Sequence, residues 1–366
     1  MKIALLGDIA LFGKYSITNS FNYEEYFSDV KKILSKCDYI IGNLEAPFTL
    51  SNVKRGNKSV YIKSDLENIN IINYLGIHAL SLANNHIYDY GKVGVKQTIE
   101  ILDKNNISWF GLNNKSLQIN IKGVSLSIYG FCSYNTNPSY SCFLNRFTNN
   151  GLNILRYKTL EHISDQKNRK NRKNINIISI HSGIENISIP SIEDLKFSRH
   201  LANKMDYIYY GHHPHVLQGN QKYKNSLFCY SLGNFCFDDI IDHRTNTPLV
   251  IQNDRNKASV ITIINIKDNE ICSYENINIY PSEEKLLCFK KQTSNNTLDL
   301  DKSLLFDLEK INEIRNKEMK LNINNRNSKR NIKWVISRLR PSTGLRILNN
   351  YLNKILYYIF YTRYIK

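Results

Sequence analysis

The chain has 366 residues, 42% of them apolar, which is enough for one large α/β domain with an appendage or for two domains. Its formal net charge is +17, but residues 310–366 contain 14 Lys and Arg against two Glu, so the rest of the chain carries only +5. This uneven charge argues against a nucleic-acid-binding core, and no nucleic-acid partner is expected. No run of residues reaches the roughly 18 uninterrupted apolar positions of a membrane-spanning helix.

The first residues and the cysteines point to a reducing compartment. The chain enters a strand pattern at Lys2, without the charged and apolar regions of a secretory signal. Its seven cysteines are scattered and include no C-x-x-C pair. Such usage is more typical of buried thiols than of a disulfide framework, and we expect a cytoplasmic protein.

Strand and helix patterns alternate through the first three quarters of the chain. Apolar runs predict strands at 2–6, 38–41, 77–82, 107–111, 117–131, 175–180, 207–210 and 227–231. Amphipathic patterns predict helices at 23–36, 65–75, 92–104 and 191–204. Residues 258–266 and 271–280 have the alternation of a closing hairpin, while 133–150 give no clear pattern. The alternation indicates an α/β sheet.

Polar side chains that bind metals or transfer protons follow five of these strands. They are Asp8; Asn43 and Glu45; Asn84, Asn85 and His86; His181; and His212, His213 and His215. In α/β sheets, ligands collect at the carboxyl ends of the strands, so we expect these residues to surround one crevice. A helix cap, a turn or a buried structural histidine would explain single members, but not their joint placement.

The segment from Gly211 to His215 is the densest part of this pattern. In an extended segment, alternate side chains share a face, which predicts that His213 and His215 point the same way and His212 the other. Pro214 stiffens the backbone between them. Neutral imidazole is the commonest metal ligand near neutral pH, so a metal site is the sharper hypothesis. A polar loop with exposed histidines is the alternative.

Six motifs, in this order, resemble the CapA-type proteins of capsule or poly-γ-glutamate synthesis. They are Gly7-Asp8, Asn43-Leu44-Glu45, the segment Leu82 to Gly91, His181-x-Gly183-x-Glu185, Gly211 to His215, and Tyr230 to Phe235. The family has a fold like that of the calcineurin-type metallophosphoesterases. The resemblance covers about residues 1–240. It implies a four-layer α/β/β/α sandwich, which we place over residues 1–290, with a metal centre at one end.

The resemblance also implies roles for individual residues. The metal ligands would be Asp8, Glu45, Asn85, His181, His213 and His215. His86 would protonate a leaving group, with Asp89 or Glu185 to orient it, and His212 is counted with the catalytic residues. Oxygen and imidazole ligands suit one or two Mn²⁺, Zn²⁺ or Fe²⁺ ions.

Two positions depart from the family pattern. Ala10 stands where the wider superfamily has a histidine, which leaves one metal position a ligand short. Ser182 stands where the family usually has tryptophan, a change that would widen or wet the pocket.

These features predict hydrolysis by a metal-activated water, with a phosphoester or an anionic cell-surface polymer as substrate. The alternative is a non-catalytic metal- or polymer-binding factor in polymer assembly or export, with other polymer-synthesis proteins as partners. Ala10 favours the alternative. His86 and Asp89 favour hydrolysis, because a purely structural site has no use for them.

Residues 300–366 form a basic tail outside the resemblance. Its pattern predicts helices at 304–323, around Trp334 to Leu339, and at 345–364. Basic residues beside aromatic and aliphatic ones suit an interfacial helix on an anionic membrane surface, here over residues 330–366. The alternative is an extension that packs on the domain or on a partner. CapA-type proteins commonly carry an N-terminal membrane anchor, and this tail would replace it at the inner membrane face.

Overall fold

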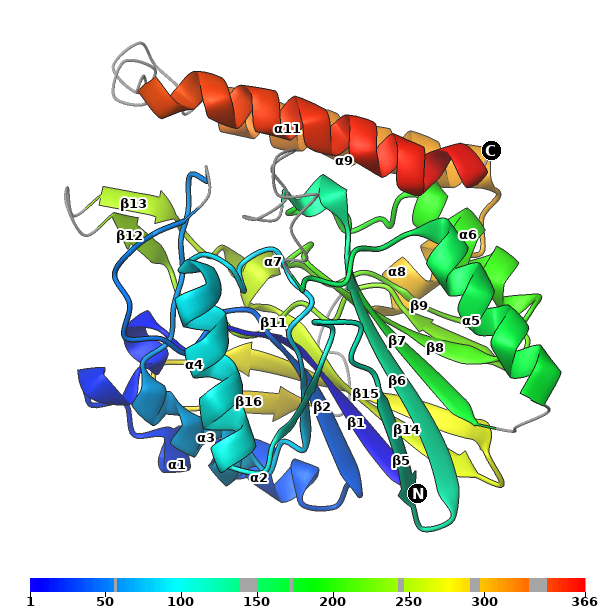
Figure 1. Cartoon of the computed structure of the whole chain (residues 1–366), viewed down its shortest axis with the longest axis horizontal. Coiled ribbons are helices and arrows are strands. Elements are labelled where there is room, and N and C mark those ends of the chain that lie inside the picture. The colour runs from blue at the N-terminus through cyan, green and yellow to red at the C-terminus, as the bar shows by residue number, and fades with distance from the viewer. Residues whose placement is uncertain are drawn as a thin grey trace.

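The computed structural model describes residues 1–55, 58–137, 151–170, 174–242, 247–289, 297–328 and 341–365. Two β-sheets lie face to face between two sets of helices (Figure 1). This is the α/β/β/α sandwich that the sequence predicts.

The first sheet has the strand order β16-β15-β14-β1-β2-β3-β4, and β11 also pairs with β1. Its strands are β1 (Lys2–Ile9), β2 (Tyr39–Leu44), β3 (Ala79–Ser81), β4 (Ser108–Phe110), β11 (Asn234–Cys236), β14 (Ser259–Lys267), β15 (Glu270–Pro281) and β16 (Leu286–Phe289). Strands β1 to β4 run parallel, so their carboxyl ends lie at one edge. The helices on its outer side are α1 (Tyr23–Tyr26), α2 (Ser28–Leu34), α3 (Ile69–Leu75) and α4 (Gly91–Lys104) (Figure 1).

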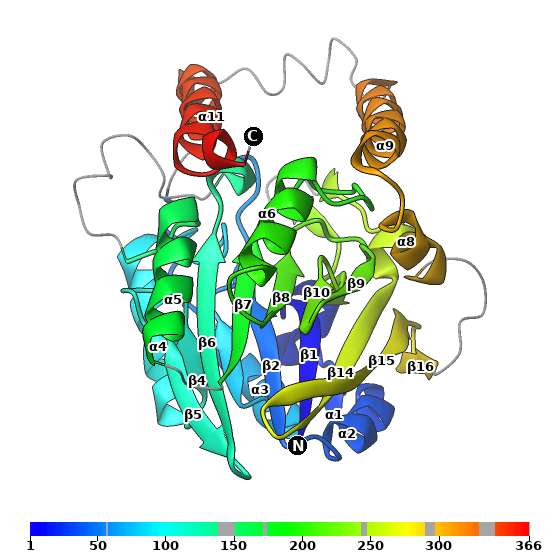
Figure 2. The same cartoon turned by 90° about the vertical axis from the view of Figure 1, so that its right-hand side faces the viewer.

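The second sheet has the order β5-β6-β7-β8-β10-β9. Its strands are β5 (Leu117–Ile121), β6 (Val124–Cys132), β7 (Ile175–His181), β8 (Tyr207–His212), β9 (Asn220–Tyr223) and β10 (Ser226–Cys229). Strands β6, β7, β8 and β10 run parallel. Helices α5 (Tyr157–Lys170) and α6 (Ile192–Ala202) cover its outer face (Figure 2).

Smaller elements complete the described chain. They are β12 (Ile240–Asp242), β13 (Thr247–Val250), α7 (Asp254–Lys257) and the 3₁₀ turns η1 (Gly13–Tyr15), η2 (Ile17–Asn19), η3 (Leu66–Asn68), η4 (Tyr134–Thr136) and η6 (Thr362–Tyr364).

Buried side chains on both faces of each strand hold the layers together. Along β1, Ile3 and Leu5 join the apolar cluster between the sheets, while Ala4 and Leu6 join the cluster beneath the outer helices. Each fully buried Ile or Leu side chain contributes roughly 1.5–3 kcal/mol to folding. Strands buried on both faces read as continuous apolar runs, which is why the sequence shows them so clearly.

Three predicted elements differ from the structure. The helix expected at 23–36 is two helices that meet at Phe27. The strand expected at 117–131 is an antiparallel hairpin, because Lys122 (φ 51°) and Gly123 (φ 80°) take left-handed conformations that suit a tight turn. The helix expected at 304–323 begins and ends later, as α9 (Leu308–Ser328), and a separate short helix, α8 (Thr297–Ser303), precedes it. The predicted helix around Trp334 lies outside the described residues.

The tail helices α9 and α11 (Pro341–Phe360) cross the end of the sandwich that lies opposite the N-terminus (Figure 1). Tyr361 is fully buried, and its hydroxyl donates to Asp194 Oδ1 at 3.2 Å. On α9, the Glu318 carboxylate accepts the Ser188 amide at 2.9 and 3.0 Å. The tail therefore packs on the second half of the sandwich, and a domain boundary near residue 290 stays a prediction. Within the described ranges, no helix combines the length and apolar character needed to cross a bilayer.

Candidate metal centre

The carboxyl ends of strands from both sheets converge on one buried cluster. In the first sheet, Asp8 lies in register with Asn43 of the neighbouring strand. In the second, His181 lies in register with His212. The Tyr210 hydroxyl comes within hydrogen-bond distance of the Leu6 and Ile41 carbonyls, so it ties the two sheets together beneath this cluster.

Two glycines let the backbone come close enough for this convergence. A Cβ atom on Gly7 would lie 2.2 Å from the Gly233 carbonyl oxygen, and one on Gly211 would lie 1.9 Å from that of Tyr230. Only glycine fits either position without a backbone shift. Each glycine immediately precedes a site residue, Asp8 or His212.

Most of the predicted metal ligands lie side by side. One ligand atom from each of Asp8, Glu45 and His181 lies within 4.8 Å of the other two, and all three residues are buried. The His215 Nε2 atom lies 3.5 Å from Glu45 Oε1. Asn85 Oδ1 lies 3.1 Å from His181 Nε2. The His213 ring also belongs to this group, since its centroid lies 5.0 Å from that of His181.

The histidine segment does not alternate as an extended strand would. His213 (φ 96°) and His215 (φ 54°) both take left-handed conformations. His212, the last residue of β8, faces the site with Nδ1 at 2.8 Å from Asp8 Oδ1, and His215 also approaches Asp8. The predicted opposite orientation of His212 is therefore wrong. Left-handed non-glycine residues cost about 1–3 kcal/mol and cluster at functional sites.

Several buried atoms of the cluster fit a cation better than a protein partner. In the described part of the chain, both carboxylate oxygens of Glu45 lack a hydrogen-bond donor, and so do Nδ1 of His181, Nδ1 of His213 and Nε2 of His212. Burying an unpaired carboxylate is costly unless a charge compensates it. Carboxylate oxygens with imidazole nitrogens form a donor set for Mn²⁺, Zn²⁺ or Fe²⁺. The residues present thus fit a divalent metal ion.

The pKa shifts of Asp8, His181 and His213 favour the protonation states of metal ligands, whereas that of Glu45 favours a bound proton where no cation compensates its charge. Burial alone would raise the pKa of Asp8, but the hydrogen bond and charge of His212 lower it to about 2. Burial and the adjacent Asp8 carboxylate raise the pKa of Glu45 well above its usual value. Burial lowers the pKa of His181, and it lowers that of His213 to about 3. Both imidazoles are therefore neutral near pH 7, as metal ligands must be.

Asn43 and Asn84, which belong to the predicted strand-end pattern, and Asn234 support the site residues through hydrogen bonds. Asn43 Nδ2 donates to Asp8 Oδ1 at 2.9 Å. Asn84 Oδ1 accepts the backbone amide of His86 at 3.1 Å. Asn234 Nδ2 donates hydrogen bonds to the Gln252 side chain and to a backbone carbonyl. Its side-chain oxygen is therefore the atom that lies 2.9 Å from His215 Nδ1, and it accepts the proton of that nitrogen. The lone pair of His215 is then on Nε2, where a metal ion can bind it. These asparagines stand in the quoted motifs, but their partners lie on other strands.

His86 is oriented by Asp89 and approached by an unexpected lysine. The Asp89 Oδ2 atom lies 2.6 Å from His86 Nδ1, and it also accepts the Ile62 amide at 3.0 Å. Lys58 Nζ lies 3.0 Å from the same His86 nitrogen. Burial lowers the pKa of His86, and Asp89 opposes this effect. Glu185 is exposed, and no hydrogen bond or ion pair joins its side chain to His86 within the described ranges.

The two departures from the family pattern take defined places. Ala10 is fully buried in an apolar cluster with Ala46, Ile62, Phe237 and Ile240. That position therefore contributes to packing and offers no ligand. Ser182 is buried, and its hydroxyl lies 3.4 Å from Asn135 Nδ2.

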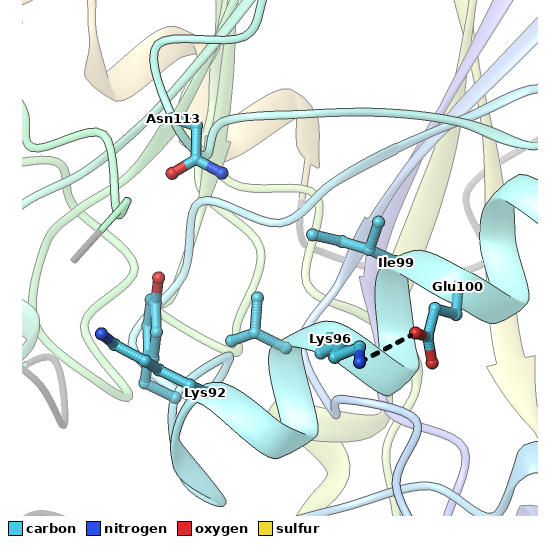
Figure 3. A pocket seen from close by; sticks show the side chains of 7 residues that line it. Lys92, Lys96, Ile99, Glu100 and Asn113 are labelled. Atoms are coloured by element: carbon cyan, nitrogen blue, oxygen red, sulfur yellow. Dashed lines mark ion pairs between the residues drawn. The ribbon is translucent and has the colours of Figure 1, made fainter. Parts of the chain in front are cut away.

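A surface hollow of about 440 Å³ lies beside helix α4 (Figure 3). Its lining residues are Tyr88, Lys92, Val95, Lys96, Ile99, Glu100 and Asn113. None of the predicted site residues lines it, so we place the chemistry at the strand ends.

The amino-acid sequence is similar to that of known capsule synthesis proteins. The chain matches the family model described as "Bacterial capsule synthesis protein PGA_cap" over residues 2–239. It is 27% identical to the capsule biosynthesis protein CapA of Bacillus anthracis over 273 residues, or 71% of this chain and 66% of that protein. It is 28% identical to the PGA biosynthesis protein CapA of Bacillus subtilis (strain 168) over 249 residues, or 65% of this chain and 63% of that protein. The chain thus spans just under two thirds of the length of these relatives.

Solved structures resemble it more distantly. A 5'-nucleotidase from Candida albicans has 13% identity and a TM-score of 0.42, with 87% of this chain and 56% of that chain covered. A hypothetical protein from Thermus thermophilus has 11% identity and a TM-score of 0.46, with 76% and 98% covered. The family model extends over well more than half of the chain and includes every predicted site residue. The chain therefore belongs to the bacterial capsule synthesis protein family PGA_cap, with CapA proteins as its curated relatives.

Proposed function

We propose that this protein is a metal-dependent hydrolase that acts in the synthesis or processing of an anionic cell-surface polymer. One observation carries the proposal. The buried Glu45 carboxylate, which has no hydrogen-bond donor among the described residues, lies against Asp8, His181 and His215. Such a cluster is unfavourable without a cation and suits a divalent ion. When bound, the ion would supply Lewis acidity and an activated water.

The residues of the chain would manage the protons. Because Asp89 holds the proton on His86 Nδ1, the other ring nitrogen is the one left for transfer. Water adds to the phosphorus or carbonyl carbon, and the bond to the leaving oxygen or nitrogen breaks. His86 Nε2 takes the proton that the water loses and delivers one to the leaving group.

The substrate class follows from the relatives' names and from the site. Those names are capsule biosynthesis and PGA biosynthesis protein. We therefore propose a capsular or poly-γ-glutamate-like polymer, or a phosphoester formed during its synthesis, as substrate. Other polymer-synthesis proteins are the proposed partners.

Metal analysis combined with a substrate panel tests this function. The wild-type protein should retain a divalent metal after dialysis and hydrolyse a phosphodiester or γ-glutamyl substrate. His213→Ala should lose both properties, whereas His200→Ala, which changes a histidine of α6 outside the cluster, should keep both. If His213→Ala keeps full metal content, the ligand assignment fails.

The second candidate is a metal- or polymer-binding factor without turnover. Ala10 favours it, because this position contributes apolar packing in place of a ligand. Wild-type protein that binds metal and polymer but hydrolyses no member of the panel would support it.

We also propose that the protein is cytoplasmic and binds the inner membrane face through its tail. Helix α11 turns polar residues inward, since Asn349 and Asn353 are buried. Its exposed apolar side chains, each between 37% and 64% accessible, are Leu345, Ile347, Leu348, Tyr351, Ile355 and Tyr358. An exposed apolar helix face within a tail of strong positive charge suits an anionic lipid surface.

A further inference from the structure

Lys58 lies against the site although the sequence around it shows only a polar segment. Its side chain is 8% exposed. The ammonium lies 2.9 Å from the Asn85 carbonyl oxygen, 3.2 Å from Asp89 Oδ1 and 3.0 Å from His86 Nδ1. Among the described residues, Lys58 is the one Lys or Arg whose charged group bonds to a predicted site residue.

The protons around His86 leave one N–H of Lys58 without an acceptor among the described residues. A separation of 2.6 Å between His86 Nδ1 and Asp89 Oδ2 requires a proton on that nitrogen, because the fully buried Asp89 carboxylate can only accept. Lys58 is itself only a donor, so it cannot also donate to a protonated Nδ1. The Asn85 carbonyl and Asp89 take two of its N–H groups. Within the described ranges, no further acceptor bonds to the third.

The Lys58 ammonium lies close enough to the metal cluster to bond to Asn85 and to act on the charge of Glu45. Burial and Asp8 raise the pKa of Glu45, and the charge of Lys58 acts against that rise. Asp8, Glu45 and Asp89 make the surroundings strongly acidic, and all three are buried. These carboxylates offset the positive charge of a bound metal ion. An anionic substrate therefore needs a further positive group close to the site.

We propose that Lys58 is a substrate-binding residue that takes an anionic oxygen, of a phosphoryl or carboxylate group, beside His86. This inference rests on the proposed function, because it concerns the same site. A charge-assisted hydrogen bond to this oxygen would hold the reacting group between the metal ligands and the His86 ring. It would also select anionic over neutral substrates, since a neutral group would leave the Lys58 donor unpaired.

Binding of inorganic phosphate tests the proposal without any need for turnover. Phosphate is titrated by calorimetry into full-length protein, with and without bound Mn²⁺. Lys58→Met, which keeps the length of the side chain and removes its charge, should weaken phosphate binding by about tenfold or more. Lys58→Arg should retain most of the affinity. Lys54→Met, at an exposed lysine of the same segment, should behave like the wild type.

A measurement of metal content distinguishes a failure of the Lys58 inference from a failure of the proposed hydrolase function. Lys58→Met should bind as much Mn²⁺ as the wild type. If Lys58→Met binds as much Mn²⁺ as the wild type and also binds phosphate with the same affinity, Lys58 does not bind the anion. If the wild type binds no metal, the proposed hydrolase fails, and the comparison in metal-free protein still decides the role of Lys58. A wild type that binds phosphate in neither form also overturns the inference.

A second measurement serves if Lys58→Met does not fold. Lysines of the wild type are labelled with ¹³C-methyl groups, which keep their charge, and the Lys58 signal is identified by its absence in Lys58→Arg. Phosphate should shift this signal with the midpoint found by calorimetry. An unchanged Lys58 signal at saturating phosphate contradicts the proposal.

Discussion

The side chain of Asn353 in α11 donates a hydrogen bond of 2.8 Å to the side-chain oxygen of Asn137, which follows η4. Asn349 donates to the same oxygen at 3.1 Å. The carbonyl of the preceding residue, Thr136, accepts Asn85 Nδ2 at 3.2 Å. Asn85 thereby turns its oxygen toward His181. The tail is thus connected to a predicted metal ligand through two successive residues.

This connection predicts that Asn353→Ala weakens metal binding from a distance. The change removes the shorter of the two hydrogen bonds to the Asn137 oxygen and loosens the turn that orients Asn85, at a cost of about 1 kcal/mol, or roughly fivefold in Mn²⁺ affinity. Asn350→Ala, on the exposed side of the same helix, is the matched control. Calorimetric titration of the two variants with Mn²⁺ should separate them. Equal affinities would show that the tail does not influence the site.

Glu45→Gln should stabilise the metal-free protein and abolish stabilisation by metal. The native carboxylate is buried without a hydrogen-bond donor in the described residues, so replacing it by a neutral amide removes a desolvation cost of roughly 1–3 kcal/mol. Urea unfolding measures the free energy of unfolding with chelator and with Mn²⁺. The wild type should gain stability from Mn²⁺ and Glu45→Gln should not. If Glu45→Gln is less stable than the wild type in chelator and is still stabilised by Mn²⁺, Glu45 is not a metal ligand.

Asp194 should make stability fall as pH rises from about 4 to about 6. Burial raises its pKa from 3.8 to about 6, although hydrogen bonds from Ser191 and Tyr361 act against this rise. The folded state therefore binds more protons than the unfolded state in this range, and stability present at low pH is lost as the carboxyl ionises. The difference amounts to about 3 kcal/mol. Asp194→Asn should remove this part of the pH dependence in urea unfolding at successive pH values, and parallel curves for the two proteins would refute it.

The exposed face of α11 should bind anionic vesicles. Leu348→Glu combined with Tyr351→Glu places two carboxylates on that face, so it should release the protein from phosphatidylglycerol vesicles in a sedimentation assay. Deletion of residues 330–366 should have the same effect. Val93→Glu, at an exposed apolar position on α4, is the control and should sediment like the wild type. Equal sedimentation of all variants would rule out the membrane role.

The amino-acid pattern was sufficient to predict the central strands and the meeting of several residues at their ends. Burial on both faces makes each central strand an uninterrupted apolar run, and the residue after such a run lies at the carboxyl edge whatever the detailed packing. This is why Asp8, Glu45 and His181 could be predicted to meet, and the structure brings them within 4.8 Å of one another.

Which side chains face each other could not be predicted in this way, because it depends on how distant segments pack. His212 bonds to Asp8 from the end of β8, and the left-handed conformations of His213 and His215 break the alternation expected of a strand. Lys58 reaches His86 from a segment without periodicity, and α11 turns its asparagines inward. Periodicity reports how a residue sits in its own element. Contacts between distant segments depend on how whole elements pack, and that packing leaves no local pattern in the chain.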